Sequence, residues 1–473
     1  MTYDRSTEVA ESTEIASSRE IAQRMEMLPL LPSHNRVART VCIGMFLDGF
    51  DTLCLAAALT VLVHQLKIQY SQIGLLISAS FGGMFVGALL FGALSERFGR
   101  RNVFVICAGL FGVFSILNGL TWDFWSLFTC RVIQGFGFGG AVPVGSALIV
   151  EYLPSSARGR VYGLNFSILF TLGFVVAPLA GVAAISLFGP IYGWRVLFLI
   201  GGIALPYAIY AGFVLPESPR WLAGRGRIKE AQAGVERLEV EARRLGVAPV
   251  KANLESIGSP KNSQTKFMEI FSRAYIRRTL VVCVLFLTVA FVQYGFNGWL
   301  PTLFVKIGGL QPRYALTLMA IANVVNLAVT VLYGMTLDRF GRRFWIIVGF
   351  AMSLIGIIVC LIGVGVYGIK TWPLLFGSSI PVVVGSGICT GAIYLYALEV
   401  FPTRIRSLGA STGSSLTRLG SILAPILIGV ILQAGFGLTG VFILLGVLCL
   451  LGLLAMGVFG IETRQKALED LTR

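Results

Sequence analysis

The sequence consists mainly of long apolar runs separated by short polar segments. A helix needs about 20 apolar residues to cross the roughly 30 Å hydrocarbon core of a bilayer, so each run predicts one transmembrane helix. The pattern therefore predicts an all-α polytopic membrane protein with twelve transmembrane helices. The runs lie at residues 37–63, 72–91, 103–120, 124–150, 161–186, 194–215, 279–305, 313–333, 344–367, 372–398, 408–432 and 439–460.

Two polar segments between the runs repeat each other. Residues 92–101 read GALSERFGRR and residues 334–343 read GMTLDRFGRR, an offset of 334 − 92 = 242. A second set of three residues returns at an offset of 399 − 151 = 248: Glu151, Pro154 and Arg158 match Glu399, Pro402 and Arg406. Both offsets are close to half of the chain, so we expect two pseudo-symmetric six-helix halves that arose by duplication.

The polar segments divide the chain into five predicted parts. A composition of 56% hydrophobic and 13% charged residues supports membrane spans over soluble domains. Residues 228–245 in the middle have helical periodicity and high charge, which predicts surface helix. The polar N-terminal segment lacks the apolar core of a signal peptide, and we expect it to be disordered. The parts are an N-terminal tail at 1–36, a first half at 37–215, a central loop at 216–278, a second half at 279–460 and a C-terminal tail at 461–473.

The net charge of +15 follows the membrane topology. If each run is one crossing, one side holds 31 of the 38 Lys and Arg residues, the other side holds five, and two lie inside runs. The positive-inside rule then predicts an inner-membrane protein with both termini in the cytoplasm. Because the basic residues do not cover a soluble face, we expect the lipid bilayer as a partner and no nucleic acid.

Four charged residues lie deep inside the runs: Asp48, Asp51, Arg131 and Arg418. Each costs about 2.5–3.5 kcal/mol to insert at a helix centre, so we expect them to be paired or functional. A buried carboxylate can gain and lose a proton as its surroundings change, which suggests proton coupling by Asp51 or Asp48 together with Arg131. A guanidinium near the midplane binds carboxylates in bidentate fashion, so Arg418 favours an anionic substrate. Purely structural ion pairs, or an Arg131 that snorkels to the surface, are the alternatives.

The run at 279–305 matches the first run by its place in the second half and carries polar groups without charge. Gln293 and Asn297 are four residues apart and share one helix face. With the aromatic residues Tyr294 and Trp299 of the same run and Tyr394 of the run at 372–398, they are candidate substrate-binding groups. Aromatic residues in apolar helices also serve simply as packing, and that alternative stays open.

The duplicated hairpins predict a conformational gate at the cytoplasmic face. Opposite charges there can form ion pairs in one state and release them in another, although positive charge that sets the topology is an equally valid role. The candidate gating residues are Glu96, Arg97, Arg100, Arg101, Glu151, Arg158, Asp338, Arg342, Arg343, Glu399 and Arg406.

Other chemistry has little support. The eight cysteines lie in or beside apolar runs without CxxC spacing, and we expect packing roles, no metal and no cofactor. We find no phosphate-binding GxxxxGK[ST] loop, so drive by ATP is not indicated. We expect a monomer that is not an enzyme.

Residues 36–465 resemble the major facilitator superfamily. The paired hairpins, RVIQGFGFGG at 131–140, PESPRWL at 216–222 and the E-x-x-P-x-x-x-R pairs carry this resemblance. PESPRWL and those pairs look like sugar porters, whereas DGFD at 48–51, WLP at 299–301 and TRLGS at 417–421 look more like aromatic acid:proton symporters and the related niacin and synaptic-vesicle-2-like transporters. The resemblance implies proton coupling by the aspartates of the first run and Arg131, with a substrate carboxylate on Arg418.

We therefore expect a secondary transporter that imports a small organic acid, aromatic or similar, with protons by alternating access. A sugar or polyol porter and a multidrug or metabolite exporter are the alternatives of the same fold. The run at 279–305 retains only Gln293 and Asn297 of the sugar-porter pattern Q-Q-x-S-G-x-N, which disfavours a hexose. A sensor that has lost transport would need an output domain larger than either tail.

Overall fold

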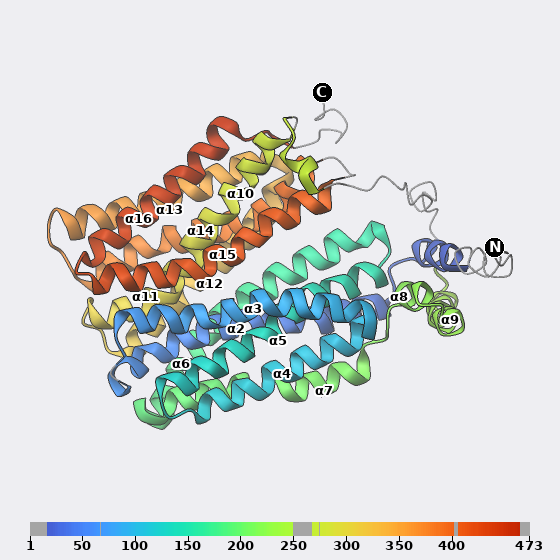
Figure 1. Ribbon diagram of the computed structural model, residues 1–473, viewed down its shortest axis with the longest axis horizontal. Coiled ribbons are helices and arrows are strands. Elements are labelled where there is room, and N and C mark those ends of the chain that lie inside the picture. The colour runs from blue at the N-terminus through green and yellow to red at the C-terminus, as the bar shows by residue number, and fades with distance from the viewer. Residues whose placement is uncertain (1–16, 67, 249–266, 274, 402–404, 464–473) are drawn as a thin grey trace, which may run out of the picture.

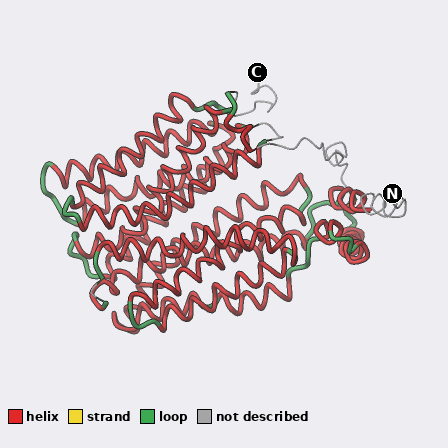
Figure 2. The backbone as a smooth tube through the Cα atoms, viewed as in Figure 1, coloured by secondary structure: helices red, strands yellow, loops and turns green. Residues whose placement is uncertain are grey.

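The computed structural model describes residues 17–66, 68–248, 267–273, 275–401 and 405–463. Within these ranges, the side chains of residues 64, 155–167, 267, 338, 406 and 407 are not described. The described chain is helical with short connecting loops and contains no strand (Figure 2). Eleven of its helical segments are long and apolar enough to cross a membrane.

The first half is built from long helices joined by tight turns. Gly99, between the second and third of them, has φ of 99°, a conformation that glycine adopts without steric cost. The helices are α2 (Pro32–Gln65), α3 (Tyr70–Phe98), α4 (Arg100–Leu120), α5 (Phe124–Tyr152), α6 (Ser155–Gly201) and α7 (Ala204–Val214).

The longest candidate span, Ile168–Val214, contains a chain reversal and therefore counts as two crossings. Gly189 inside α6 has φ of 71° and ψ of 172°, which breaks the helix. After the break, Gly193 packs against the preceding segment, since a Cβ on it would lie 2.8 Å from Cα of Ile185. The expected twelve transmembrane helices are thus confirmed.

Two short helices, α8 (Pro219–Gly224) and α9 (Ile228–Arg244), follow the first half. The predicted surface helix at 228–245 is confirmed, because α9 buries Ala231, Val235 and Leu238 and exposes its charged face. The second half then comprises η2 (Phe267–Phe271), α10 (Ile276–Ala290), η3 (Phe291–Phe296), α11 (Asn297–Lys306), α12 (Pro312–Phe340), α13 (Arg342–Gly365), α14 (Trp372–Val400), α15 (Arg406–Gln433), α16 (Gly437–Leu454) and η4 (Ala455–Phe459).

The two halves meet along α3 with α15, α6 with α12, and α2 with α11. We call the end of the bundle with the Gly99 and Gly341 turns, α8 and α9 the basic face, and the opposite end the far end. At the far end, the Ser71 amide donates to Gln433 Oε1 at 3.1 Å. The halves separate toward the basic face (Figure 1).

The seventh span departs from the single regular helix that its sequence predicts. Residues 291–296 form a turn of π-helix, η3, between α10 and α11. Pro301 in α11 lacks the N–H that would bond the carbonyl of Asn297, so regular α-helical bonding is already interrupted nearby. π-Helical turns of this kind occur frequently at functional sites.

The N-terminal segment is not disordered where the structure describes it, so this expectation was wrong for residues 17–36. Residues 17–27 form a helix, and α2 begins at Pro32 instead of Val37. The N-terminal helix buries Ile21 and Met25, and Arg24 donates to both carboxylate oxygens of Glu239 on α9 at 2.8 and 2.9 Å. The buried apolar positions and the fork-shaped ion pair provide the tertiary contacts that fix this short helix.

The ion pair of Arg24 with Glu239 leads to a prediction about stability. Arg24 holds the pKa of Glu239 below its ordinary value. The ion pair therefore stabilises the fold above the ordinary glutamate pKa of about 4.3, and the stabilisation is lost as pH falls through the lowered pKa. We expect Arg24→Ala to cost about 1 kcal/mol at pH 7, because the pair is partly exposed, and this cost to shrink toward zero in acid.

Thermal unfolding of the purified protein as a function of pH measures this difference. Arg227→Ala is the matched control, since Arg227 directly precedes α9, pairs with Glu230 on an exposed surface and should cost less. A cost of Arg24→Ala that stays constant to acid pH would contradict the assignment of the effect to Glu239.

Candidate functional site

A buried ion pair lies in the middle of the first half. Asp51 is 51 − 32 = 19 residues into the 34-residue helix α2, and Arg131 comes from α5. Arg131 Nη1 donates to both carboxylate oxygens of Asp51 at 2.9 Å each. The residues are 3% and 2% exposed, so Arg131 does not snorkel to the surface. Removing one partner of such a pair costs about 3–5 kcal/mol, because the other charge is left buried and unpaired.

Two amide side chains, absent from the candidates drawn from the sequence, extend this pair. Gln134 Nε2 donates to Asp51 at 3.1 Å, and Gln134 Oε1 accepts from Arg131 at 2.8 Å. Asn118 on α4 donates to the same Gln134 oxygen at 2.8 Å. Gln134 lies three residues after Arg131 on the same helix face, which was the available signal. The role of Asn118 depends on the packing of α4 against α5, which the sequence does not show.

Asp48 and Asp51 line one small pocket. Its walls come from α2, α3, α5 and α11 and include Ser80, Met84 and Gly298. The hydroxyl oxygen of Ser80 is buried and has no described hydrogen-bond partner. The pocket therefore lies between polar groups of the first half and Gly298 of the second half, which follows the π-helical turn η3.

Arg418, from the other half, contacts one residue in the wall of this pocket. It lies 418 − 406 = 12 residues into the 28-residue helix α15, and its Nη1 contacts the thioether of Met84, a pocket-lining residue, at 3.9 Å. Its charge is close enough to interact with Asp48 and with Tyr294. A thioether is a weak acceptor, so the described contact leaves most of the donors of this guanidinium available.

The polar residues of the seventh span are buried with unused acceptors. Asn297 Nδ2 donates to the Gln293 carbonyl at 2.8 Å, while Gln293 Oε1 and Asn297 Oδ1 have no described partner. Tyr294 packs edge-on against Phe81 of the pocket wall, with ring centroids 4.9 Å apart. Tyr394 on α14 is 46% exposed and close enough to Tyr294 for an electrostatic interaction. Tyr294 thus lies near both Arg418 and Tyr394, and the substrate contacts of the two tyrosines stay a prediction.

Trp299 lies elsewhere, in the seal at the far end. It is fully buried, its indole Nε1 donates to the Pro425 carbonyl at 3.2 Å, and its ring lies 6.3 Å from that of Tyr70. Lys306 sits over the same Tyr70 ring, 4.4 Å from its centroid. The structure therefore corrects the expected substrate contact for Trp299, because no surface of this residue remains for a ligand.

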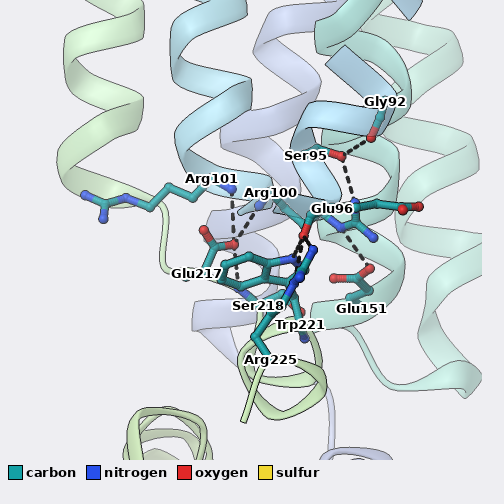
Figure 3. Close-up of polar contacts among 10 residues, drawn as sticks. All are labelled: Gly92, Ser95, Glu96, Arg100, Arg101, Glu151, Glu217, Ser218, Trp221 and Arg225. Carbon is teal, nitrogen blue, oxygen red and sulfur yellow. Dashed lines mark hydrogen bonds and ion pairs between the residues drawn. The ribbon is translucent and has the colours of Figure 1, made fainter. Parts of the chain in front are cut away.

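At the basic face, the hairpin after α3 forms part of the expected charge network (Figure 3). Arg100 Nε pairs with Glu151 at 3.1 Å. Glu217, which follows α7, accepts hydrogen bonds from the backbone N–H groups of Arg100 and Arg101 and from its neighbour Ser218. A carboxylate at the first N–H groups of α4 satisfies donors that the helix itself leaves unpaired and interacts favourably with the helix dipole.

The second half repeats this arrangement. Arg342 pairs with Glu399 at 2.8 Å, and the carboxylate of Glu462 accepts from the backbone N–H groups of Arg342 and Arg343. The offset of the two capping glutamates is 462 − 217 = 245, between the offsets of the hairpins and of the paired glutamates. Gly99 and Gly341 make room for them, since a Cβ on either would lie within 2.6 Å of a glutamate oxygen.

Several gating candidates have other contacts than the expected ion pairs. The Arg101 and Arg343 guanidinium groups donate to the Gly212 and Gly457 carbonyls instead of to a glutamate. Glu96 is exposed, and its carbonyl accepts from Trp221 and Arg225. The guanidinium of Arg97 lies 5.4 Å from the ring centroid of Phe98. The side chains of Arg158, Asp338 and Arg406 lie outside those that the structure describes.

Glu217 and Glu462 are functional-site residues that were not among the candidates predicted from the sequence. Their signal was a glutamate directly after the sixth and the twelfth apolar run, followed by Ser218 and Thr463. Nothing in the sequence showed that each would cap the third helix of its own half. That contact depends on how the last helix of each half packs beside the hairpin.

Comparison with known proteins decides the family. The family model described as "Sugar (and other) transporter" matches residues 37–473. The chain belongs to this family of the major facilitator superfamily. It is therefore a membrane transporter and not an enzyme.

The transporter is similar over most of its length to named relatives. The niacin transporter NiaP of Acinetobacter baylyi is 30% identical over 460 residues, which cover 95% of this chain and 98% of that protein. A gallate transporter of Pseudomonas putida and the 4-hydroxybenzoate transporter PcaK of Pseudomonas aeruginosa are each 27% identical, with 86% of this chain and 88% of each relative covered.

Solved structures confirm the fold. A D-xylose-proton symporter matches the transporter with a TM-score of 0.71 at 21% identity, covering 91% of this chain and 99% of that chain. The inward-open xylose transporter XylE from E. coli matches with a TM-score of 0.70, also at 21% identity, covering 92% and 98%. At this identity the likeness concerns the fold alone.

The capping glutamates make a testable prediction for the transporter. Glu217→Ala leaves the N–H groups of Arg100, Arg101 and Ser218 without their described acceptor, so we expect a loss of about 1–3 kcal/mol of stability. Glu217→Gln keeps an acceptor oxygen and should lose less. A lowered melting temperature of the purified protein measures this effect.

Glu96→Ala is the control on the same hairpin, because the described hydrogen bonds of Glu96 use its backbone carbonyl. If Glu217→Ala and Glu96→Ala melt at the same temperature as wild type, Glu217 does not hold the hairpin.

Proposed function

We propose that this transporter imports a small organic acid, an aromatic carboxylate or a similar one, together with protons. The observation that carries the proposal is Arg418, near the middle of α15. Its guanidinium lies behind the pocket wall, with the weak thioether acceptor of Met84 as its described polar contact. Carboxylates match the planar donor fork of arginine. The names of the niacin, gallate and 4-hydroxybenzoate transporters support an acid with an aromatic ring.

The proposed orientation places the basic face and both termini in the cytoplasm of a cell with this protein in its inner membrane. The excess of Lys and Arg on that side supports this orientation. The conformation, sealed at the far end and separated toward the basic face, is then open inward. We take the monomer as the working unit, with the halves at 37–215 and 279–460, the central loop at 216–278, and tails at 1–36 and 461–473.

In the proposed cycle, Asp51 and Arg131 form the proton switch. While Arg131 holds both carboxylate oxygens, Asp51 keeps its charge. When Arg131 moves away, a carboxylate buried in this environment takes up a proton, because desolvation disfavours its charged form. The ion pairs of Arg100 with Glu151 and of Arg342 with Glu399 stabilise each half at the basic face and serve as the proposed gate.

The experiment that tests the proposal is uptake into proteoliposomes. Labelled nicotinate, 4-hydroxybenzoate and gallate are offered with and without an imposed pH gradient, and xylose tests the sugar-porter alternative. We expect at least one acid to accumulate only when the gradient is present. Accumulation of xylose and of none of the acids would reject the proposal.

Arg418 provides the first prediction from this function. Arg418→Lys keeps the charge but loses the planar fork, so affinity for the transported acid should fall by about 1.5–3 kcal/mol, the value of a hydrogen bond to a charged group. Arg418→Ala should abolish saturable binding. Binding of labelled acid to purified protein measures both, and normal binding by Arg418→Ala would end the anion-site proposal.

Asp51 provides the second prediction from this function. Asp51→Asn resembles the protonated carboxyl group and cannot cycle, so we expect gradient-driven accumulation to be lost while exchange of acid across the membrane continues. Asp48→Asn is the matched comparison one turn away. If Asp51→Asn still concentrates the acid and Asp48→Asn does not, the proton site is Asp48; if both still do, the proton-coupling proposal fails.

A further inference from the structure

The two aspartates of α2 have very different surroundings, although they line the same pocket. The Asp51 carboxylate accepts hydrogen bonds from Arg131 and Gln134, all from the first half. The Asp48 carboxylate has no described hydrogen bond; the bond described for this residue, from Thr52, is accepted by its backbone carbonyl. Asp48 is 8% exposed and borders the pocket, and burial of this extent favours a nearby cation or a proton for a carboxylate without a hydrogen-bond partner.

Arg418, a cation of the opposite half, lies beside the pocket that Asp48 lines. Met84 lines the pocket and also contacts Arg418 Nη1 at 3.9 Å, so the guanidinium lies behind the pocket wall. Phe81, the next wall residue, contacts Tyr294 in the same way. The charges that face Asp48 are therefore Asp51 on its own helix, Arg131 on α5 and Arg418 on α15, with the phenol of Tyr294 on η3.

We infer that Asp48 competes with the substrate for Arg418: the ionised carboxylate acts as the internal counter-ion of Arg418, and its protonation frees the guanidinium for the substrate carboxylate. This inference rests on the proposed anion site at Arg418 and adds a regulation of that site. Its physical basis is charge balance. Asp48 and Arg418 together are neutral, so an added anion would leave one uncompensated negative charge between the halves, whereas an anion that arrives with a proton keeps the site neutral.

The inference assigns different tasks to the two aspartates. Asp51 exchanges Arg131, its partner in the same half, for a proton, so its protonation accompanies a conformational change. Asp48 faces across the interface, and its proton sets whether Arg418 is available. Substrate affinity should therefore rise as pH falls, which links the binding of acid and proton before any movement of the halves.

The test is equilibrium binding of labelled nicotinate, 4-hydroxybenzoate or gallate, whichever acid the uptake assay selects, to purified full-length protein between about pH 5.5 and 8. Wild type should bind more tightly at the acid end. Asp48→Asn removes the competing charge, so its affinity at the alkaline end should rise about tenfold and its pH dependence should flatten. Asp48→Glu keeps a carboxylate and should retain the pH dependence of wild type.

Glu236→Gln on α9 is the control for the same chemical change at an exposed position, and it should bind as wild type does. Size-exclusion profiles of all variants show whether each is folded. If Asp48→Asn shows wild-type affinity and pH dependence while Arg418→Ala has lost binding, the competition is refuted and the anion site stands. If Arg418→Ala binds normally, the proposed function itself has failed. Loss of binding in a folded Asp48→Asn protein would also overturn the inference, since Asp48 would then bind the substrate instead of competing with it.

Discussion

The bundle depends on keeping charge neutral where water is scarce. Asp51 and Arg131 can both lie in the middle of an apolar half because their charges compensate each other, and Gln134 adds one hydrogen bond to each. Their association fixes α2 against α5 and gives the first half a rigid polar centre. The second half has Gln293 and Asn297 without charge and a π-helical turn in the corresponding span. The duplicated halves thus divide the work, with proposed proton chemistry in one and deformable substrate contacts in the other.

At the basic face, the first N–H groups of the helices need hydrogen-bond acceptors and the charged side chains need partners of opposite charge. Glu217 and Glu462 accept the first N–H groups of α4 and α13, while Arg100 and Arg342 pair with Glu151 and Glu399. The network lies within each half, so the halves can move as units. Contacts between the halves at the far end include the hydrogen bond of Ser71 with Gln433, and alternating access requires such an interface to open and close.

The sequence by itself determined the class, the number of spans and the duplication. Apolar length is sufficient for a membrane helix, since a bilayer accepts few other structures, and the offsets of the repeated motifs show the two halves. It also identified Asp51, Arg131 and Arg418, because a charge inside an apolar run is conspicuous without any knowledge of contacts. The pairing of Asp51 with Arg131 was accessible from their similar depth.

Only the tertiary structure decided which groups meet. Trp299 looked like a ligand contact in sequence, yet it closes the far end because α11 packs against Tyr70 and Pro425. Arg101 resembled Arg100 but bonds a carbonyl, since adjacent residues on a helix point about 100° apart. The ordered N-terminal helix depends on a distant partner, Glu239 on α9. Periodicity and composition report the local environment of a residue, whereas these roles arise from partners about 100 or more residues away, which no local pattern encodes.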